Sequence, residues 1–152
     1  MKISDFDEAC MREALLQADL AAELGEVPIG AVAAREGVIV ARAHNVREKD
    51  HNPLGHAEVL LIDQLAKKLQ SWRLDDVTIY VTCEPCLMCS GAMLQARIPR
   101  VVYGCKDPKA GACGSLYHVL QDKRLNHQTE TASGVLENEC GQKLSEFFKK
   151  LR

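Results

Sequence analysis

Hydrophobic and polar positions recur with two different periods along the chain, and each period predicts a type of element. Near the N-terminus, Met11, Leu15, Ala18 and Ala22 are spaced by four, three and four residues. This spacing predicts the buried stripe of an amphipathic helix, because an α-helix turns once every 3.6 residues. The first long element of the chain is therefore expected to be a helix.

Both ends of this helix carry local signals. Ser4 is followed three residues later by Asp7, which resembles a capping box with Asp in the place of Glu. Gly25 comes directly after the periodic segment and is the residue type that most often follows a helix C-terminus. We expect the helix to lie between these two signals.

Extended apolar or β-branched runs predict the strands of the protein. The Glu36-Gly37 pair separates the first two runs and is typical of a hairpin turn. The predicted strands lie at 29–34, 38–43, 77–81, 101–103 and, with a weaker pattern, 131–136.

Helical segments separate most of these strands. We expect helices over 55–69, from Pro85 to about Gln95, over 116–121 and from Glu137 onward, with a loop at 105–114. Pro85 is suited to the first turn of a helix, where its missing N–H has no partner in any case. Strands that alternate with helices predict an α/β fold, in which helices cover both faces of one sheet.

Composition adds limits to this picture. The chain has 152 residues, of which 47% are apolar and 26% are charged, so we expect a single domain over 1–152 rather than a disordered, collagen-like or coiled-coil protein. No apolar run approaches the roughly 18 residues of a membrane span. The acidic N-terminal residues lack the features of a signal peptide. The seven cysteines are an odd number, which favours reduced thiols in a cytoplasmic protein.

The net charge of −2 hides an uneven distribution. Residues 1–30 hold two basic and seven acidic side chains, a local charge of −5, whereas 97–109 and 143–152 each have a local charge of +3. The small total argues against a strongly basic nucleic-acid binder. The two basic segments nevertheless allow a polarised surface that binds RNA.

The most informative residues are two short motifs, one around His56 and one around Cys86. Cys86 and Cys89 are three residues apart at the start of a predicted helix, so their sulfur atoms share one face. The positive end of the helix dipole favours thiolates there. Two thiolates and the His56 imidazole form a nitrogen–sulfur donor set of the kind that zinc prefers, and three protein ligands leave a fourth position open for water.

Glu58 is a candidate proton acceptor for such a water molecule. At a helix start that points at the metal, His56 can bind zinc while Glu58 reaches the water. Zinc lowers the pKa of the water towards about 7, and a glutamate beside it can carry the proton to a ring nitrogen and then to departing ammonia. His-x-Glu followed by Pro-Cys-x-x-Cys is the known signature of the zinc-dependent base deaminases.

An alternative interpretation is a closed structural zinc site in an RNA-binding module. Cys83, Cys105 or Cys113 would then be the fourth ligand, and Glu58 would have no role. Cys83 falls before the predicted helix, so we interpret it as a small packed residue. The same interpretation applies to the remaining cysteines, which are Cys10, Cys105, Cys113 and Cys140.

With these motifs placed, nearly the whole chain resembles the bacterial tRNA-specific adenosine deaminases, a family of the cytidine deaminase-like superfamily. The zinc motif alone would admit cytidine, cytosine, guanine and riboflavin-pathway deaminases. The narrower resemblance depends on Glu-Val-Pro-Ile-Gly-Ala-Val at 26–32, Asn45, the loop at Asp107 and the Phe-Phe pair at 147–148. It implies a three-layer α/β/α fold around a mixed five-stranded sheet.

The resemblance also implies an activity and its partners. The expected reaction is hydrolytic deamination of the wobble adenosine of a tRNA anticodon stem-loop to inosine, usually in an arginine tRNA, by a homodimer with one Zn²⁺ per subunit. A free-base or nucleoside deaminase, such as a guanine or cytosine deaminase, is the alternative enzyme.

Site roles follow from the same resemblance. His56, Cys86 and Cys89 would bind zinc, Glu58 would carry protons, and the Cys86 backbone N–H would stabilise the new hydroxyl. The expected substrate contacts are Asn45, Ala57, Asp107, Lys109, Phe148 and Arg152.

Each substrate contact also has a plainer interpretation. Asn45 and the Asp107-Pro108 pair are common turn formers, Lys109 would by default be a solvated charge, and Phe148 would belong to the core. Three features depart from the family pattern: Gly55 where Ala is frequent, Cys83 where Leu is usual, and no further basic residues after Arg152.

Overall fold

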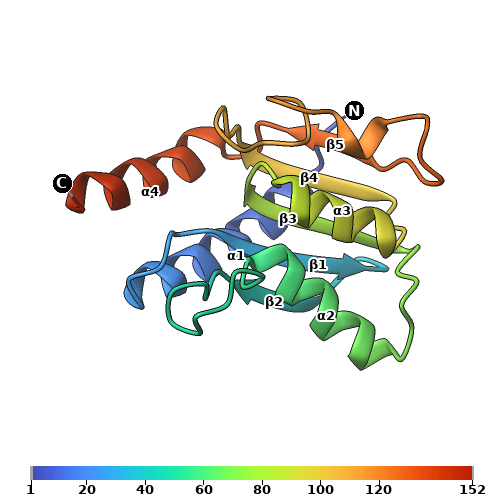
Figure 1. The fold of residues 1–152 in the computed structure, drawn as a ribbon, viewed down its shortest axis with the longest axis horizontal. Coiled ribbons are helices and arrows are strands. Elements are labelled where there is room, and N and C mark those ends of the chain that lie inside the picture. Colours follow the sequence, from blue (N-terminus) through green and yellow to red (C-terminus); the bar gives the residue numbers. More distant parts are fainter. Residues whose placement is uncertain (1, 152) are drawn as a thin grey trace.

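The computed structural model describes residues 2–151, and within that range four α-helices cover a five-stranded sheet (Figure 1). The strands are β1 (Gly30–Arg35), β2 (Val38–His44), β3 (Val77–Cys83), β4 (Arg100–Cys105) and β5 (Glu130–Ser133). The helices are α1 (Asp5–Glu23), α2 (Ala57–Leu69), α3 (Leu87–Gln95) and α4 (Glu137–Lys150), with a 3-10 helix at Val119–Gln121. No helix in this range is long and apolar enough to cross a membrane. The predicted α/β class is confirmed.

The sheet is mixed, with the strand order β2-β1-β3-β4-β5. β1 runs antiparallel to both β2 and β3, whereas β3, β4 and β5 are parallel to one another. The hairpin predicted at Glu36-Gly37 is confirmed, with φ of 53° and 76° at these two residues. Positive φ at both central positions gives a turn whose twist matches that of the flanking strands.

Alternating side chains divide the core between the two faces of the sheet. Val32 and Tyr80 point to the face covered by α1 and α4, whereas Ala33 and Ile79 point to the face covered by α2 and α3. Figure 1 shows α2 and α3 in front of the sheet, α1 behind it, and the far end of α4 projecting beyond the sheet. The result is the predicted three-layer arrangement.

Helix α1 begins and ends largely as its sequence signals predict. The Ser4 hydroxyl accepts a hydrogen bond from the Asp7 N–H, and the Ser4 N–H donates to the Asp7 carboxylate, each at 3.0 Å. Gly25 has a φ of 77°, the left-handed conformation that ends many helices. The buried stripe ends at Ala21 rather than at the predicted Ala22, because a stripe that follows 3.6 residues per turn drifts along the helix.

Other element boundaries differ from the predictions. The helix predicted over 116–121 is limited to Val119–Gln121, since the preceding segment forms a tight turn in which Gly114 N–H donates to Tyr117 O at 2.8 Å. The helix predicted from Pro85 begins at Leu87. The strand predicted over 131–136 is Glu130–Ser133, and Gly134 follows it with a φ of 87°.

A buried ion pair joins α1 to the start of β4. The Arg100 guanidinium donates to both carboxylate oxygens of Asp7, at 2.8 and 3.0 Å, and the Tyr80 hydroxyl donates to the same carboxylate at 2.6 Å. The hydrogen bond from Arg100 is the main reason that the pKa of Asp7 lies far below its ordinary value. This pair fixes α1 on the sheet at the edge where β4 begins.

Candidate active site

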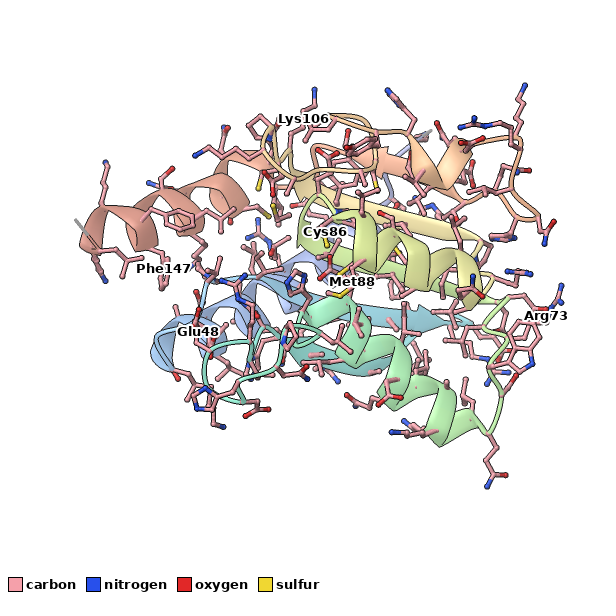
Figure 2. All side chains as sticks on the ribbon, viewed as in Figure 1. Glu48, Arg73, Cys86, Met88, Lys106 and Phe147 are labelled. Carbon is pink, nitrogen blue, oxygen red and sulfur yellow. The ribbon has the colours of Figure 1, made fainter. Side chains whose placement is uncertain are left out.

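The starts of two helices bring the predicted metal ligands together at one end of the sheet. His56 is the N-cap of α2, Cys86 is the N-cap of α3, and Cys89 lies in the first turn of α3. Neither N-cap side chain forms a capping hydrogen bond with its own helix. Figure 2 shows Cys86 at the end of α3 that lies beside the start of α2. Both side chains are instead directed towards each other, with the Cys86 sulfur 3.6 Å from Nδ1 of His56.

The three donor atoms have the spacing of a tetrahedral metal site. Nδ1 of His56 lies 3.6 Å from the Cys86 sulfur and 3.5 Å from the Cys89 sulfur. Zinc bond lengths and tetrahedral angles give an ideal nitrogen–sulfur separation of about 3.6 Å. Within residues 2–151, these three side chains form the cluster whose ligand atoms all lie within 4.8 Å of one another. The donor set fits zinc in both chemistry and spacing.

The same cluster has strongly shifted pKa values. Hydrogen bonds that the Cys86 sulfur accepts from the Cys89 thiol and from the His56 ring lower the pKa of Cys86 to about 3. The hydrogen bond with Cys86 raises the pKa of His56 above its ordinary value. The Cys86 sulfur is thus held as a thiolate, the form that binds metals.

Glu58 lies beside this cluster but outside it. Its side chain is in the first turn of α2 and the residue is 4% exposed. Burial raises the pKa of Glu58 to about 7. A carboxyl group with a pKa near neutrality can both accept and donate a proton during one reaction cycle.

A pocket of about 140 Å³ opens over Glu58 and two of the metal-site side chains, His56 and Cys86. Its walls come from four parts of the chain: the segment before β1, the stretch from the end of β2 to the first turn of α2, the junction between β3 and α3, and the loop after β4. The lining residues are Val27, Ile29, Asn45, Arg47, His56, Ala57, Glu58, Cys83, Glu84, Cys86, Asp107 and Ala110. The pocket therefore brings Glu58, His56 and Cys86 into one cavity with residues of the loop after β4.

Asn45 and Ala57, two of the predicted substrate contacts, both line this pocket. The Asn45 side chain also has a structural role, since its oxygen accepts a hydrogen bond from Arg47 N–H at 3.1 Å and its amide donates to Val27 O at 3.4 Å. Ala57 is fully buried at the start of α2. The turn-forming interpretation of Asn45 thus holds alongside its position in the pocket.

Three further predicted contacts lie along a second cavity of about 620 Å³. Asp107 lines both cavities, and Lys109 and Phe148 line the second. The Asp107 side chain also caps a turn by accepting hydrogen bonds from the N–H groups of Lys109 and Ala110, at 3.0 and 3.1 Å. Phe148 is 45% exposed rather than part of the core, and Arg152 lies outside the described residues.

The cysteines proposed as a fourth zinc ligand have other neighbours. Cys113 lies near the Ser90 hydroxyl at 3.4 Å, and the Cys105 thiol donates to Thr82 O at 3.4 Å. Cys83 is 5% exposed and lies in the wall of both cavities. In the described part of the chain, none of the three belongs to the metal-site cluster. Their positions do not support a closed structural site.

Sequence reasoning missed two buried carboxylates, Glu84 in the pocket wall and Glu26, which binds backbone N–H groups of the β2–α2 loop. Glu26 accepts hydrogen bonds from Glu48 N–H at 3.0 Å and Lys49 N–H at 2.6 Å, and Glu84 accepts several from the loop after β4. Both are nearly inaccessible, with exposed fractions of 1% and 3%. The sequence did offer one signal, because each glutamate lies next to an apolar strand. An acidic side chain that is buried there needs hydrogen-bond or charge partners.

The comparisons with known proteins agree with this geometry. The profile of the MafB19-like deaminases matches residues 6–152. A tRNA-specific adenosine deaminase of Bacillus subtilis is 53% identical over 146 residues, which cover 96% of this chain and 91% of that protein. One of Haemophilus influenzae is 47% identical over 150 residues, which cover 98% and 87%.

Solved structures show the same fold. A structure from a study of A-to-I editing by tRNA:A34 deaminases at the wobble position has a TM-score of 0.86 and 38% identity, and the match covers 90% of this chain and 99% of that one. A guanine deaminase from Nitrosomonas europaea has a TM-score of 0.79 at 20% identity, with 92% and 83% covered, which shows a shared fold alone. The predicted mixed five-stranded fold is confirmed.

Proposed function

The chain belongs to the MafB19-like deaminase family, and from this we propose that it is a zinc-dependent tRNA adenosine deaminase that converts the wobble adenosine of an anticodon to inosine. One observation carries the proposal. The buried Glu58 lies next to a three-donor metal site in a chain that is 53% identical to a tRNA-specific adenosine deaminase.

His56, Cys86 and Cys89 would hold the zinc ion. Zinc bound there would supply the Lewis acidity that makes water a nucleophile near neutral pH. Glu58 would accept a proton from the attacking water and deliver it to N1 of the adenine ring, while the water oxygen bonds to C6. The same carboxylate would then take the proton of the new C6 hydroxyl and deliver it to the 6-amino nitrogen. The C6=O bond would form as the C6–N bond breaks, and ammonia would leave. The net reaction consumes adenosine and water and yields inosine and ammonia.

The other pocket residues would orient the nucleoside. Asn45 would hold the flipped nucleoside, since its amide hydrogen bond to Val27 O is long at 3.4 Å and can be exchanged for a substrate contact. Backbone atoms of Ala57 would meet the base edge. The backbone N–H of Cys86, at the positive end of α3, would stabilise the hydroxyl that forms at C6.

The second cavity would bind the nucleotides that flank the target. Asp107, Lys109 and Phe148 supply an acceptor, a cation and an exposed ring for stacking, which are the groups that bind single-stranded RNA. Arg152 would add a further cation. The family resemblance favours an arginine tRNA, and such a substrate is found in the cytoplasm.

We also propose that the enzyme is a homodimer, as the resemblance implies. An apolar groove between α2 and α3 supports this proposal, because its lining includes Ile62, Ala92 and Trp72, which is 63% exposed. Light scattering should give a mass near twice that of the chain. A mass of one chain at micromolar concentration would rule out the dimer.

The deaminase activity is tested directly by mapping inosine. The zinc-loaded protein is incubated with an anticodon stem-loop carrying a wobble adenosine and, in parallel, with free guanine and free cytosine. We expect inosine at the wobble position and no turnover of the free bases. Turnover of the free bases alone would identify a different deaminase.

A further inference from the structure

Glu84 is a buried acidic residue that the proposed chemistry does not use. It follows β3 directly and precedes Pro85 and the metal-site residue Cys86. The residue is 3% exposed. A carboxylate at this depth is costly unless its oxygen atoms are fully hydrogen-bonded, so its partners indicate what it does.

Those partners all come from the loop that follows β4. Oε1 accepts hydrogen bonds from Asp107 N–H at 3.1 Å and from the Ser115 hydroxyl. Oε2 accepts from Cys113 N–H and Ser115 N–H, each at 3.0 Å. Burial alone would raise the pKa of Glu84, but these hydrogen bonds outweigh it and lower the pKa below its ordinary value. The carboxylate thus binds both ends of the segment 107–115.

The middle of the same segment is shaped around the carboxylate. A Cβ atom added at Gly111 would lie 2.3 Å from Cδ and Oε2 of Glu84, and 2.6 Å from Asp107 O. Non-bonded contacts of a Cβ atom are essentially never this short. The backbone can therefore pass this close to the carboxylate only because residue 111 is glycine. Backbone bonds complete the arrangement, with Glu84 N–H donating to Cys105 O and Ala112 N–H donating to Pro85 O, each at 2.9 Å.

The segment held in this way forms one wall of the pocket. Asp107 and Ala110 line the pocket opposite residues of the β2–α2 loop. In the described part of the chain, no cationic side chain forms an ion pair with Glu84. The carboxylate is therefore stabilised by N–H and O–H groups of the loop itself.

We propose that Glu84 is a positioning residue, which folds residues 107–115 against the start of α3 and so sets the pocket wall that meets the RNA. This inference rests on the proposed deaminase function for its effect on the reaction. Glu84 acts through Asp107 and Ala110 rather than on the reacting atoms. Its loss should weaken substrate binding equally in the ground and transition states, which raises KM and leaves kcat nearly unchanged.

The test compares the zinc-loaded wild type with Glu84→Gln, which has the same shape but presents an amide NH₂ to loop N–H groups. We expect KM for the anticodon stem-loop to rise at least about tenfold and kcat to stay within about threefold, with the zinc content unchanged. Hydrogen exchange at the amides of 107, 113 and 115 should quicken at least about tenfold, while α1 keeps its protection. Glu23→Gln, at an exposed position on α1, is the matched control and should behave as the wild type.

Two further variants extend the test, and the first of them keeps it decisive if Glu84→Gln folds poorly. Ser115→Ala removes one donor to the carboxylate and should produce the same changes, with a rise in KM of about threefold. Gly111→Ala should displace the carboxylate, so its effect combined with Glu84→Gln should be much smaller than the sum of the single effects.

Unchanged KM and unchanged loop exchange in Glu84→Gln would overturn the inference, as would a fall in kcat with KM preserved. Additive effects of the Gly111 and Glu84 substitutions would also contradict it. Absence of inosine with the wild type would count against the proposed function alone, because the exchange measurement reports on the loop without any substrate.

Discussion

Nδ1 of His56 lies 3.5 Å from the sulfur of Cys89, although 33 residues separate them in the chain. The contact exists because the first turn of α2 and the first turn of α3 meet at the end of the sheet where β3 ends. Each helix start directs an uncapped donor side chain towards the other. This relationship is the basis for the first two predictions.

Replacing Cys86 with Ser should remove zinc and activity together. The thiolate that the cluster stabilises would be lost, and a serine hydroxyl is a weak zinc ligand. Metal analysis of the purified variant should show zinc far below one equivalent, and inosine formation should fall with it. Cys10→Ala is the control, because Cys10 lies on the buried face of α1 and burial raises its pKa to about 11. Full zinc content in Cys86→Ser would contradict this assignment.

Replacing Glu58 with Ala should abolish deamination and leave zinc in place. A proton-transfer group contributes about 10²–10⁴-fold to a rate, so kcat should fall by at least about 10²-fold. The thermal midpoint should not fall, since the change removes a buried carboxyl group. The exposed Gln64→Ala on the same helix serves as control. Inosine formation at the wild-type rate would show that Glu58 does not carry the proton.

Acid should destabilise the protein in part through Asp7. Its pKa in the folded protein is lowered, chiefly by the hydrogen bond from Arg100, so the ion pair contributes to the free energy of unfolding above the ordinary Asp pKa. That contribution should disappear as the pH falls below about 4 towards the lower folded-state value. Urea midpoints measured from pH 7 to pH 2 should show this fall in the wild type and a much shallower one in Asp7→Asn.

At pH 7, Asp7→Asn should lower the free energy of unfolding by about 3 kcal/mol, because it leaves a largely buried guanidinium without its counter-charge. The control is Asp63→Asn, which breaks an exposed ion pair with Lys67 and should cost less than about 0.5 kcal/mol. Equal effects of the two substitutions would mean that the Asp7–Arg100 pair contributes no more than a surface pair.

Gly30 should not tolerate a side chain. A Cβ atom there would lie 2.1 Å from Ala14 O and 2.5 Å from Ala18 N, both on the backbone of α1. Gly30→Ala should therefore push α1 from β1 and lower the free energy of unfolding by about 3 kcal/mol. Gly141→Ala in α4 is the control, because its Cβ would have an ordinary contact of 3.9 Å, and it should be neutral or stabilising by up to about 1 kcal/mol. Chemical denaturation measures both.

Lys109→Ala should weaken RNA binding through charge alone. If Lys109 contacts a phosphate of the stem-loop, its loss should reduce the slope of log K against log salt concentration by about 0.7–0.9. Affinity measured at several salt concentrations, with metal-free protein to prevent turnover, gives the slope. Lys67→Ala on α2 is the control and should leave the slope unchanged. An unchanged slope in Lys109→Ala would show that Lys109 is a solvated charge that does not contact the RNA.

Much of the fold was predictable from local patterns. The α1 cap at Ser4, the hairpin turn at Glu36-Gly37 and the strand at 77–81 each depend on neighbouring residues, and each appears in the structure. The segment 116–121 was predicted as a helix, and there tertiary hydrogen bonds override the local pattern: Leu116 N–H donates to Gly111 O and Val119 N–H donates to Ala112 O, each at 3.0 Å.

The chemistry of this protein can be read from local sequence, because residue types and their spacing at helix starts decide which ligands and which proton carrier are available. His-x-Glu and Cys-x-x-Cys are short-range patterns, and they identified the donor set before any contact was known. The construction of the pocket around them depends instead on long-range contacts. The strand order β2-β1-β3-β4-β5, the burial of Glu84 and its contact with Gly111 join residues that lie far apart in the chain. Such contacts depend on packing across the whole sheet, and no local pattern encodes them.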